Sequence, residues 1–105
     1  MLAVTIDSLP GYEIRKVLGE VLGTTARQQN AFMEGIRELS GGPGRNLPVV
    51  LRKWREDAIA RMTEVAYQRG ANAVVGMRFD HRTIGPTWTE ICAYGTAVFV
   101  VPARS

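Results

Sequence analysis

The chain has very few side chains of the kinds that ligate soft metals or act as thiol nucleophiles. Its 105 residues include one histidine, His81, and one cysteine, Cys92. A structural zinc site takes four ligands, so these two residues are too few to form one within a single chain. A single cysteine also forms no internal disulfide, and we therefore expect a reducing, cytoplasmic location.

Features that would indicate a membrane or a nucleic-acid partner are also missing. No apolar run approaches the roughly 20 residues that span a bilayer, and the start lacks the basic and apolar regions of a signal peptide. The net charge is +3, from 13 Lys and Arg against 10 Asp and Glu. The densest basic cluster, residues 52–55, is followed directly by Glu56 and Asp57, which weaken its field. We therefore expect neither a membrane nor a nucleic-acid partner.

Two common enzymatic motifs are absent as well. The chain has no G-x-S-x-G nucleophile motif. Its glycine-rich stretch, residues 40–44, lacks the Lys-Ser/Thr pair that a phosphate-binding P-loop requires. The composition, 46% apolar and 22% charged, is that of a globular protein. The length favours one domain over residues 1–105.

The hydrophobic pattern predicts an α+β fold with the element order β-β-α-α-β-β. Apolar residues recur at steps of three and four over residues 48–69, which is typical of an amphipathic helix. Gly19 and Gly23 interrupt an otherwise strand-like run and indicate a bulge or a close backbone contact. We expect an antiparallel sheet with both helices on one face. The predicted strands cover residues 4–6, 12–26, 73–82 and 88–101, and the predicted helices cover residues 28–39 and 48–69.

The last two strands are predicted to form a hairpin. With its centre at Gly85, Arg78 lies opposite Cys92 and Asp80 lies opposite Glu90. Side chains along a strand alternate between the two faces of a sheet. The odd-numbered positions of this hairpin are mostly apolar, so we expect them to lie under the long helix.

The other face of the hairpin, made by the even-numbered positions, is mixed in character. It combines aromatic, apolar and charged side chains, whereas a sheet face in contact with water is usually more polar. Aromatic residues and arginine are enriched where subunits meet. We therefore predict that this face binds a small ligand or another copy of the chain. The candidate residues are Arg78, Asp80, Trp88, Glu90 and Tyr94.

Two other functions stay open. His81 and Cys92 lie on opposite faces in this register, so they form neither a shared metal site nor a Cys-His dyad within one chain. One alternative is a soft or transition metal ion held by Cys92 or His81 repeated around a ring of subunits. The other is an enzyme that uses Asp80 and Glu90 as an acid–base pair. Arg78 and Arg82 share their face, which favours an ion-pair network instead.

Several segments together resemble a known family. They are "LPGYEI" with "VLGEVLGTT", then "REDAIARMTEVAYQRGANAVVGMRFD", and finally "EICAYGTAV". The chain resembles the YbjQ-like proteins, a small bacterial family labelled as heavy-metal-binding. The resemblance implies a dodecin-like α+β fold and a homo-oligomer, a ring of five copies, and it supplies no ligand residues. We thus predict a non-enzymatic oligomeric domain that needs no cofactor and binds a small ligand or a partner at its subunit junctions.

Overall fold

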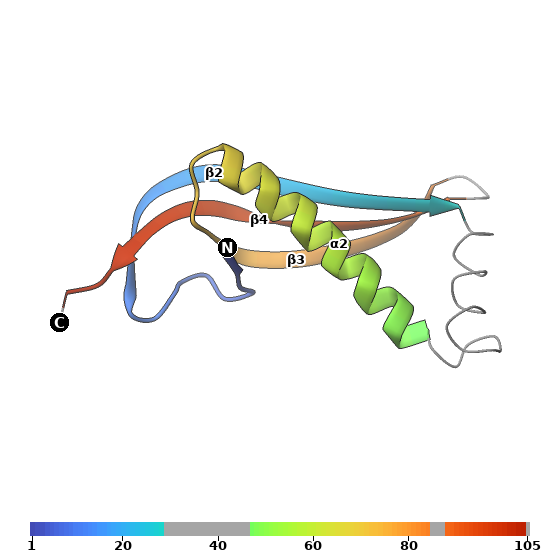
Figure 1. Ribbon diagram of the computed structural model, residues 1–105, viewed down its shortest axis with the longest axis horizontal. Coiled ribbons are helices and arrows are strands. Elements are labelled where there is room, and N and C mark those ends of the chain that lie inside the picture. Colours follow the sequence, from blue (N-terminus) through green and yellow to red (C-terminus); the bar gives the residue numbers. More distant parts are fainter. Residues whose placement is uncertain (29–46, 85–87, 105) are drawn as a thin grey trace.

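The computed structural model describes residues 1–28, 47–84 and 88–104. Its elements are β1 (Leu2–Ala3), β2 (Tyr12–Gln28), α2 (Leu47–Gln68), β3 (Ala73–Ile84) and β4 (Trp88–Pro102). Figure 1 shows a long, curved sheet that α2 crosses on one face. The α+β class is therefore confirmed. The helix predicted over 28–39 falls outside the described residues except for Gln28, which belongs to β2.

The sheet is mixed, and the prediction of a purely antiparallel sheet was wrong. Its strand order is β1-β3-β4-β2, with β1 parallel to β3 and the other pairs antiparallel. The N-terminal segment continues along β3 beyond β1, because Met77 N–H donates to Val4 O at 2.9 Å and Gly76 N–H donates to Ile6 O at 2.8 Å. The strand expected over 4–6 was misplaced, because the structure has strand β1 at Leu2–Ala3 and it pairs parallel to β3.

Helix α2 ends where the sequence predicts. Gly70 follows it with a φ of 90°, a left-handed conformation that glycine adopts without strain. Ala71 N–H donates to Ala66 O at 3.0 Å, and Gly70 N–H donates to Tyr67 O at 2.9 Å. These two bonds form a Schellman motif and satisfy carbonyls that the helix end leaves free. Within the described ranges, no helix has the length and hydropathy needed to cross a membrane.

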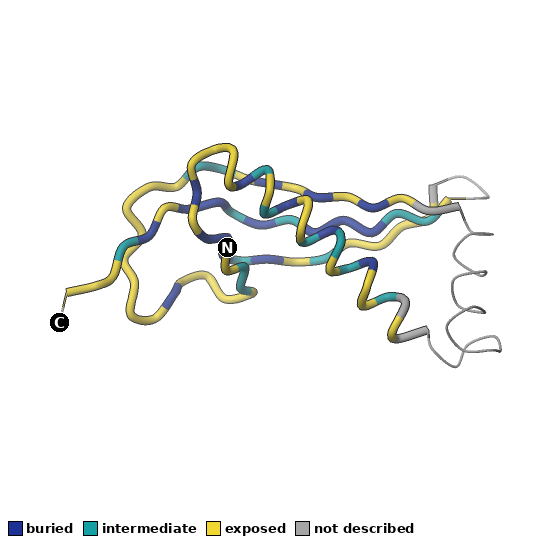
Figure 2. Tube along the Cα trace, in the orientation of Figure 1, coloured by how far each residue is buried: buried dark blue, intermediate teal, exposed yellow. Residues whose placement is uncertain are grey.

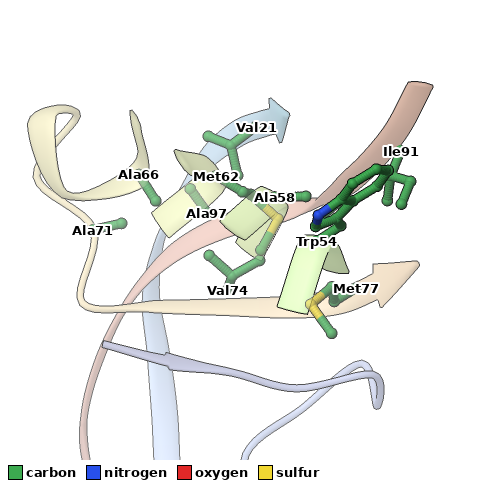
Figure 3. Close-up of a cluster of buried hydrophobic side chains, with 11 residues drawn as sticks. Val21, Trp54, Ala58, Met62, Ala66, Ala71, Val74, Met77, Ile91 and Ala97 are labelled. Carbon is green, nitrogen blue, oxygen red and sulfur yellow. The ribbon is translucent and has the colours of Figure 1, made fainter. Parts of the chain in front are cut away.

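The main core lies between α2 and the sheet. Figure 3 shows Met62 and Ala58 of the helix beside Val21 of β2, with Val74 and Ile91 on the other strands. Figure 2 shows that buried positions recur along the strands and along α2. The apolar stripe predicted for this helix is therefore the side that packs on the sheet.

The helix approaches β2 very closely at Gly23. A Cβ atom added at this position would overlap Ala58 O and Met62 N of the helix backbone. Gly19, four residues earlier, has a φ of 97° and lies at a register shift between β2 and β4. The two glycines thus provide the close contact and the bulge that the sequence indicates.

A second, smaller core lies on the opposite face of the sheet. The N-terminal loop folds over one end of this face and buries Leu9 there. Val4 packs at the margin of the same cluster. Only this end of the second face is covered by the N-terminal segment. The buried members of the cluster are Leu9, Ala73, Val75, Val98 and Val100.

The contact at Gly23 gives a direct test of the packing. We expect Gly23→Ala to lower the free energy of unfolding by about 3 kcal/mol or more, because the helix backbone must move away from β2. Gly70→Ala is the matched control, since its added Cβ meets nothing within 4 Å and it bears only the left-handed strain, about 1 kcal/mol. Urea denaturation of both variants measures the difference. Equal losses would contradict the close helix contact.

Candidate functional site

The hairpin register differs from the predicted one by two residues. Arg78 pairs with Tyr94 and Asp80 pairs with Cys92, whereas the prediction placed Cys92 and Glu90 opposite them. Ile84 pairs with Trp88, so the centre of the hairpin lies one residue beyond Gly85. Because the shift is even, each of these side chains stays on its predicted face. The pairing of Asp80 with Glu90 was therefore wrong.

A bulge reverses the faces at the start of β3. The register shifts between Val75 and Arg78, and Gly76 has a φ of 62° there. Val74 consequently lies in the core under α2, whereas Val75 lies in the second core. The prediction had placed Val75 under the helix. The extra residue in a bulge changes which alternate side chains face the helix.

The face opposite α2, which we call the open face, collects all five predicted site residues. Directly paired residues of antiparallel strands share a face, with Cβ atoms about 5 Å apart. The open face is therefore ordered in rows across β2, β4 and β3. Three successive rows are Leu22–Tyr94–Arg78, Thr24–Cys92–Asp80 and Ala26–Glu90–Arg82. The next row contains Trp88 of β4, which is exposed.

Two arginines of the open face are held by defined partners. Arg82 Nε lies 3.2 Å from Glu90 Oε1, and the side chains are 65% and 18% exposed. Arg78 Nη1 donates to Thr5 O at 2.7 Å and to Met77 O at 2.8 Å. Arg78 thus fastens the N-terminal segment to β3, which is a structural role that its position in the sequence did not reveal.

Cys92 lies in the middle of the charged rows and is only 7% exposed. Burial raises the pKa of its thiol, and the carboxylates of Glu90 and Asp80 raise the pKa further, while Arg82 partly offsets them. The thiolate is the nucleophilic and metal-binding form of cysteine. The surroundings of Cys92 therefore favour the unreactive thiol.

His81 lies on the α2 face of the sheet, away from Cys92. Arg55 Nε donates to His81 Nε2 at 3.3 Å, and the His81 ring stacks on Phe79 with 6.5 Å between ring centroids. Nε2 of His81 is thus used as a hydrogen-bond acceptor and is not free to bind a metal. Across the described part of the chain, no three His, Cys, Asp or Glu side chains are grouped to hold a metal ion.

Sequence reasoning missed the contribution of β2 to the open face. Val17 pairs with Val98 and Ile14 pairs with Val100, which places both on the side of the second core. Val17 is 69% exposed and Leu22 is 50% exposed. The sequence of β2 shows apolar residues at both odd and even positions. Its two bulges interrupt the alternation of faces, so the face of each residue could not be assigned from the sequence.

The chain matches a family model and several relatives over nearly its whole length. A family model described as "Putative heavy-metal-binding" matches residues 1–101. A UPF0145 protein from Acidothermus cellulolyticus is 48% identical over 103 residues, covering 95% of each chain. A second UPF0145 protein, from Streptomyces coelicolor, is 45% identical and covers 95% of this chain and 97% of its own.

The relatives extend beyond bacteria, so the expectation of a bacterial family is not confirmed. A UPF0145 protein from the archaeon Thermoplasma volcanium is 39% identical, covering 100% of this chain and 88% of its own. A crystal structure of a DUF74-family protein of unknown function from Pediococcus pentosaceus has a TM-score of 0.64 at 13% identity. The match covers 96% of this chain and 98% of that one, and it supports the fold.

The environment of Cys92 predicts a slow thiol. We expect iodoacetamide at pH 8 to alkylate Cys92 at least about tenfold more slowly than a cysteine at the exposed position of Tyr67, in a Tyr67→Cys, Cys92→Ser control. The raised pKa also has a consequence for stability. The stability from the neutral thiol is present below the usual thiol pKa of about 8.5 and is lost as pH rises above it. Equal alkylation rates for Cys92 and for the cysteine at position 67 would contradict the buried environment described for Cys92.

Proposed function

The chain belongs to the YbjQ-like family, and from that premise we propose that it is a non-enzymatic, homo-oligomeric domain that buries its open face against other copies of itself. The observation that carries the proposal is the combination of exposed apolar side chains and ion-pairing groups on that face. Val17, Leu22 and Trp88 are all exposed there. Exposed apolar and aromatic side chains interspersed with charged ones are characteristic of an interaction surface.

The shape of the single chain supports the same proposal. Its radius of gyration is 16.4 Å, and its extents are 53 × 26 × 18 Å. A compact chain of about 100 residues has a radius of gyration of about 13 Å. Within the described residues, one helix covers one face of this long sheet, and the N-terminal segment covers one end of the other face. Contact with further copies would bury the remainder, and the resemblance to the family implies a closed ring of five.

The charged rows give such an interface its specificity. Arg82 and Glu90 already form an ion pair, whereas Asp80 forms no ion pair within the described residues. Charges at an interface exclude wrong partners and orient right ones more than they add affinity. Asp80 is therefore the residue of this face best placed to accept a donor from a neighbouring copy.

A small ligand at the junction is the second element of the proposal. Tyr94 lies between Leu22 and Arg78 in its row, and Trp88 lies farther along the same strand. Aromatic rings offer a flat apolar surface, and tyrosine adds a polar end. We propose that the ligand contacts Tyr94 or Trp88, which lie six residues apart on β4, with Asp80 and Glu90 in the rows between them.

Heavy-metal binding is the alternative that the family description suggests. The residues of one chain do not fit such a centre, because the described part supplies one protonated thiol between two carboxylates and no cluster of three donors. A metal site at Cys92 would require thiols from several copies to meet. Catalysis by Asp80 and Glu90 is weaker still, since the carboxylate of Glu90 is neutralised by Arg82.

A charge placed on the open face tests the assembly. We expect Leu22→Asp to shift the protein to a smaller species, because a carboxylate would have to be buried unpaired at the junction. The monomer should keep its fold, since Leu22 is half exposed there. Leu22→Ile is the matched control that keeps the apolar character. Native mass spectrometry of untagged protein gives the copy number, and a monomeric wild type would contradict the proposal.

Metal binding is tested with Cd²⁺ as a soft probe. We expect Cys92→Ser and His81→Ala to leave the Cd²⁺ affinity within about twofold of wild type, because the Cys92 thiol is buried with a raised pKa and Nε2 of His81 already accepts a hydrogen bond. Isothermal titration of the three proteins after chelator treatment measures this. A loss of tenfold or more in Cys92→Ser alone would replace the proposed ligand with a metal held at Cys92.

A further inference from the structure

Two arginines cover part of the β2 edge of the sheet. Arg61 Nη1 donates to Thr24 O at 2.8 Å, and Arg69 Nη1, directly after α2, donates to Glu20 O at 2.7 Å. Each of these guanidinium groups thus meets an oxygen acceptor of its own chain. Arg55 lies on the side of α2 toward β3, and it meets no oxygen acceptor among the described residues. It is therefore an arginine with donors left for a ligand.

The guanidinium of Arg55 is nevertheless held in one orientation. Its Nε donates to His81 Nε2 at 3.3 Å, and its Cζ lies 5.8 Å from the centre of the Phe79 ring. At that distance a cation is attracted to the face of an aromatic ring. The Phe79 and His81 rings are themselves stacked, with an interplanar angle of 11°. The half-buried Arg55 is thus positioned before any ligand arrives, and its two Nη groups remain as donors.

The positive charge of Arg55 is not neutralised within the described part of the chain. Glu56 and Asp57 follow it in the helix, but residues one and two positions apart on a helix do not face each other. On β3, Asp80 lies on the open face, whereas His81 lies on the α2 face. The described ion pairs do not include Arg55. An anion from outside the chain would therefore meet a guanidinium without a competing carboxylate.

A second arginine lies one turn earlier on the same side of α2. Residues three apart on a helix are neighbours, so the exposed Arg52 lies beside Arg55. Glu56 is four residues from Arg52 and competes for its charge, although no ion pair joins the two among the described residues. Arg52 thus adds a second, weaker positive group next to the one held over Phe79.

Two neighbouring guanidinium groups favour a phosphate group over a carboxylate. One guanidinium already satisfies both oxygens of a carboxylate in a bidentate pair. A phosphate monoester carries about −1.5 to −2 charges at pH 7 and has three acceptor oxygens, enough for two arginines. We propose that Arg55, assisted by Arg52, binds the phosphate group of a small phosphorylated molecule beside Phe79 and His81. This site goes beyond the proposed function, because it lies on the α2 face and not on the open face.

The single histidine of the chain serves as the reporter for a test. We expect inorganic phosphate, at constant pH and ionic strength, to shift the NMR signals of the His81 ring saturably. Arg55→Gln should weaken phosphate binding at least about tenfold, because charge-assisted hydrogen bonds are lost. Lys53→Gln is the matched control, since it removes the same charge from an exposed position of the same helix turn. Its affinity should stay within about twofold of wild type, because an exposed charge outside the site is screened by salt.

A second variant and a second anion complete the test. Arg52→Gln, at an exposed position that tolerates substitution, should weaken binding about threefold, since Glu56 offsets part of its charge. Equal losses in Arg55→Gln and Lys53→Gln, both with the circular dichroism spectrum of the wild type, would reveal a general charge effect and overturn the site. Acetate that binds as tightly as phosphate would refute the ligand class. The absence of a saturable shift up to about 50 mM phosphate would refute binding altogether. These results do not depend on copy number, so the open-face proposal stands or falls separately with Leu22→Asp.

Discussion

The contact between Gly23 and the backbone of α2 determines much of the remaining structure. Without a Cβ at this position, the helix lies directly on β2, with Ala58 O and Met62 N above the glycine. The layer between helix and sheet is thin as a result, and small residues such as Ala93 and Ala97 are completely buried in it. The same approach brings Arg61 and Arg69 within reach of the β2 edge. One contact therefore buries one face of the sheet and covers part of one edge.

Helix α2 covers only one face of the sheet, so the opposite face stays partly exposed. Val21 faces the helix while its neighbour Leu22 is half exposed on the open face, so β2 is apolar on both sides. Strands that are apolar on both sides are typical of sheets covered on both faces. The N-terminal loop covers only the end where Leu9 packs. A single chain thus satisfies the hydrophobic pattern of its longest strand only in part, which is the physical basis for the proposed association.

Local patterns predicted the elements well, and the errors arise where pairing is decided by tertiary contacts. The long helix and three strands follow from periodicity, and Gly70 marks the helix end. The bulge beside Gly76 was not predictable, because it depends on the N-terminal segment bonding to the opposite edge of β3. The predicted site survived a two-residue error in register because an even shift preserves faces. A one-residue error would have moved Cys92 under the helix.

The sequence around Cys92 suggests three functions: an interaction surface, a metal site and an acid–base pair. The arrangement of these residues in the structure favours the interaction surface. A metal site or a nucleophile needs the thiolate, but burial of Cys92, and then the carboxylates of Glu90 and Asp80 beside it, raise the pKa of its thiol. An acid–base pair needs a free carboxylate, but Arg82 neutralises Glu90 at 3.2 Å. Each group thus reduces the chemical reactivity of its neighbour while keeping its capacity for ion pairs and packing. A surface with these properties is suited to recognising another surface.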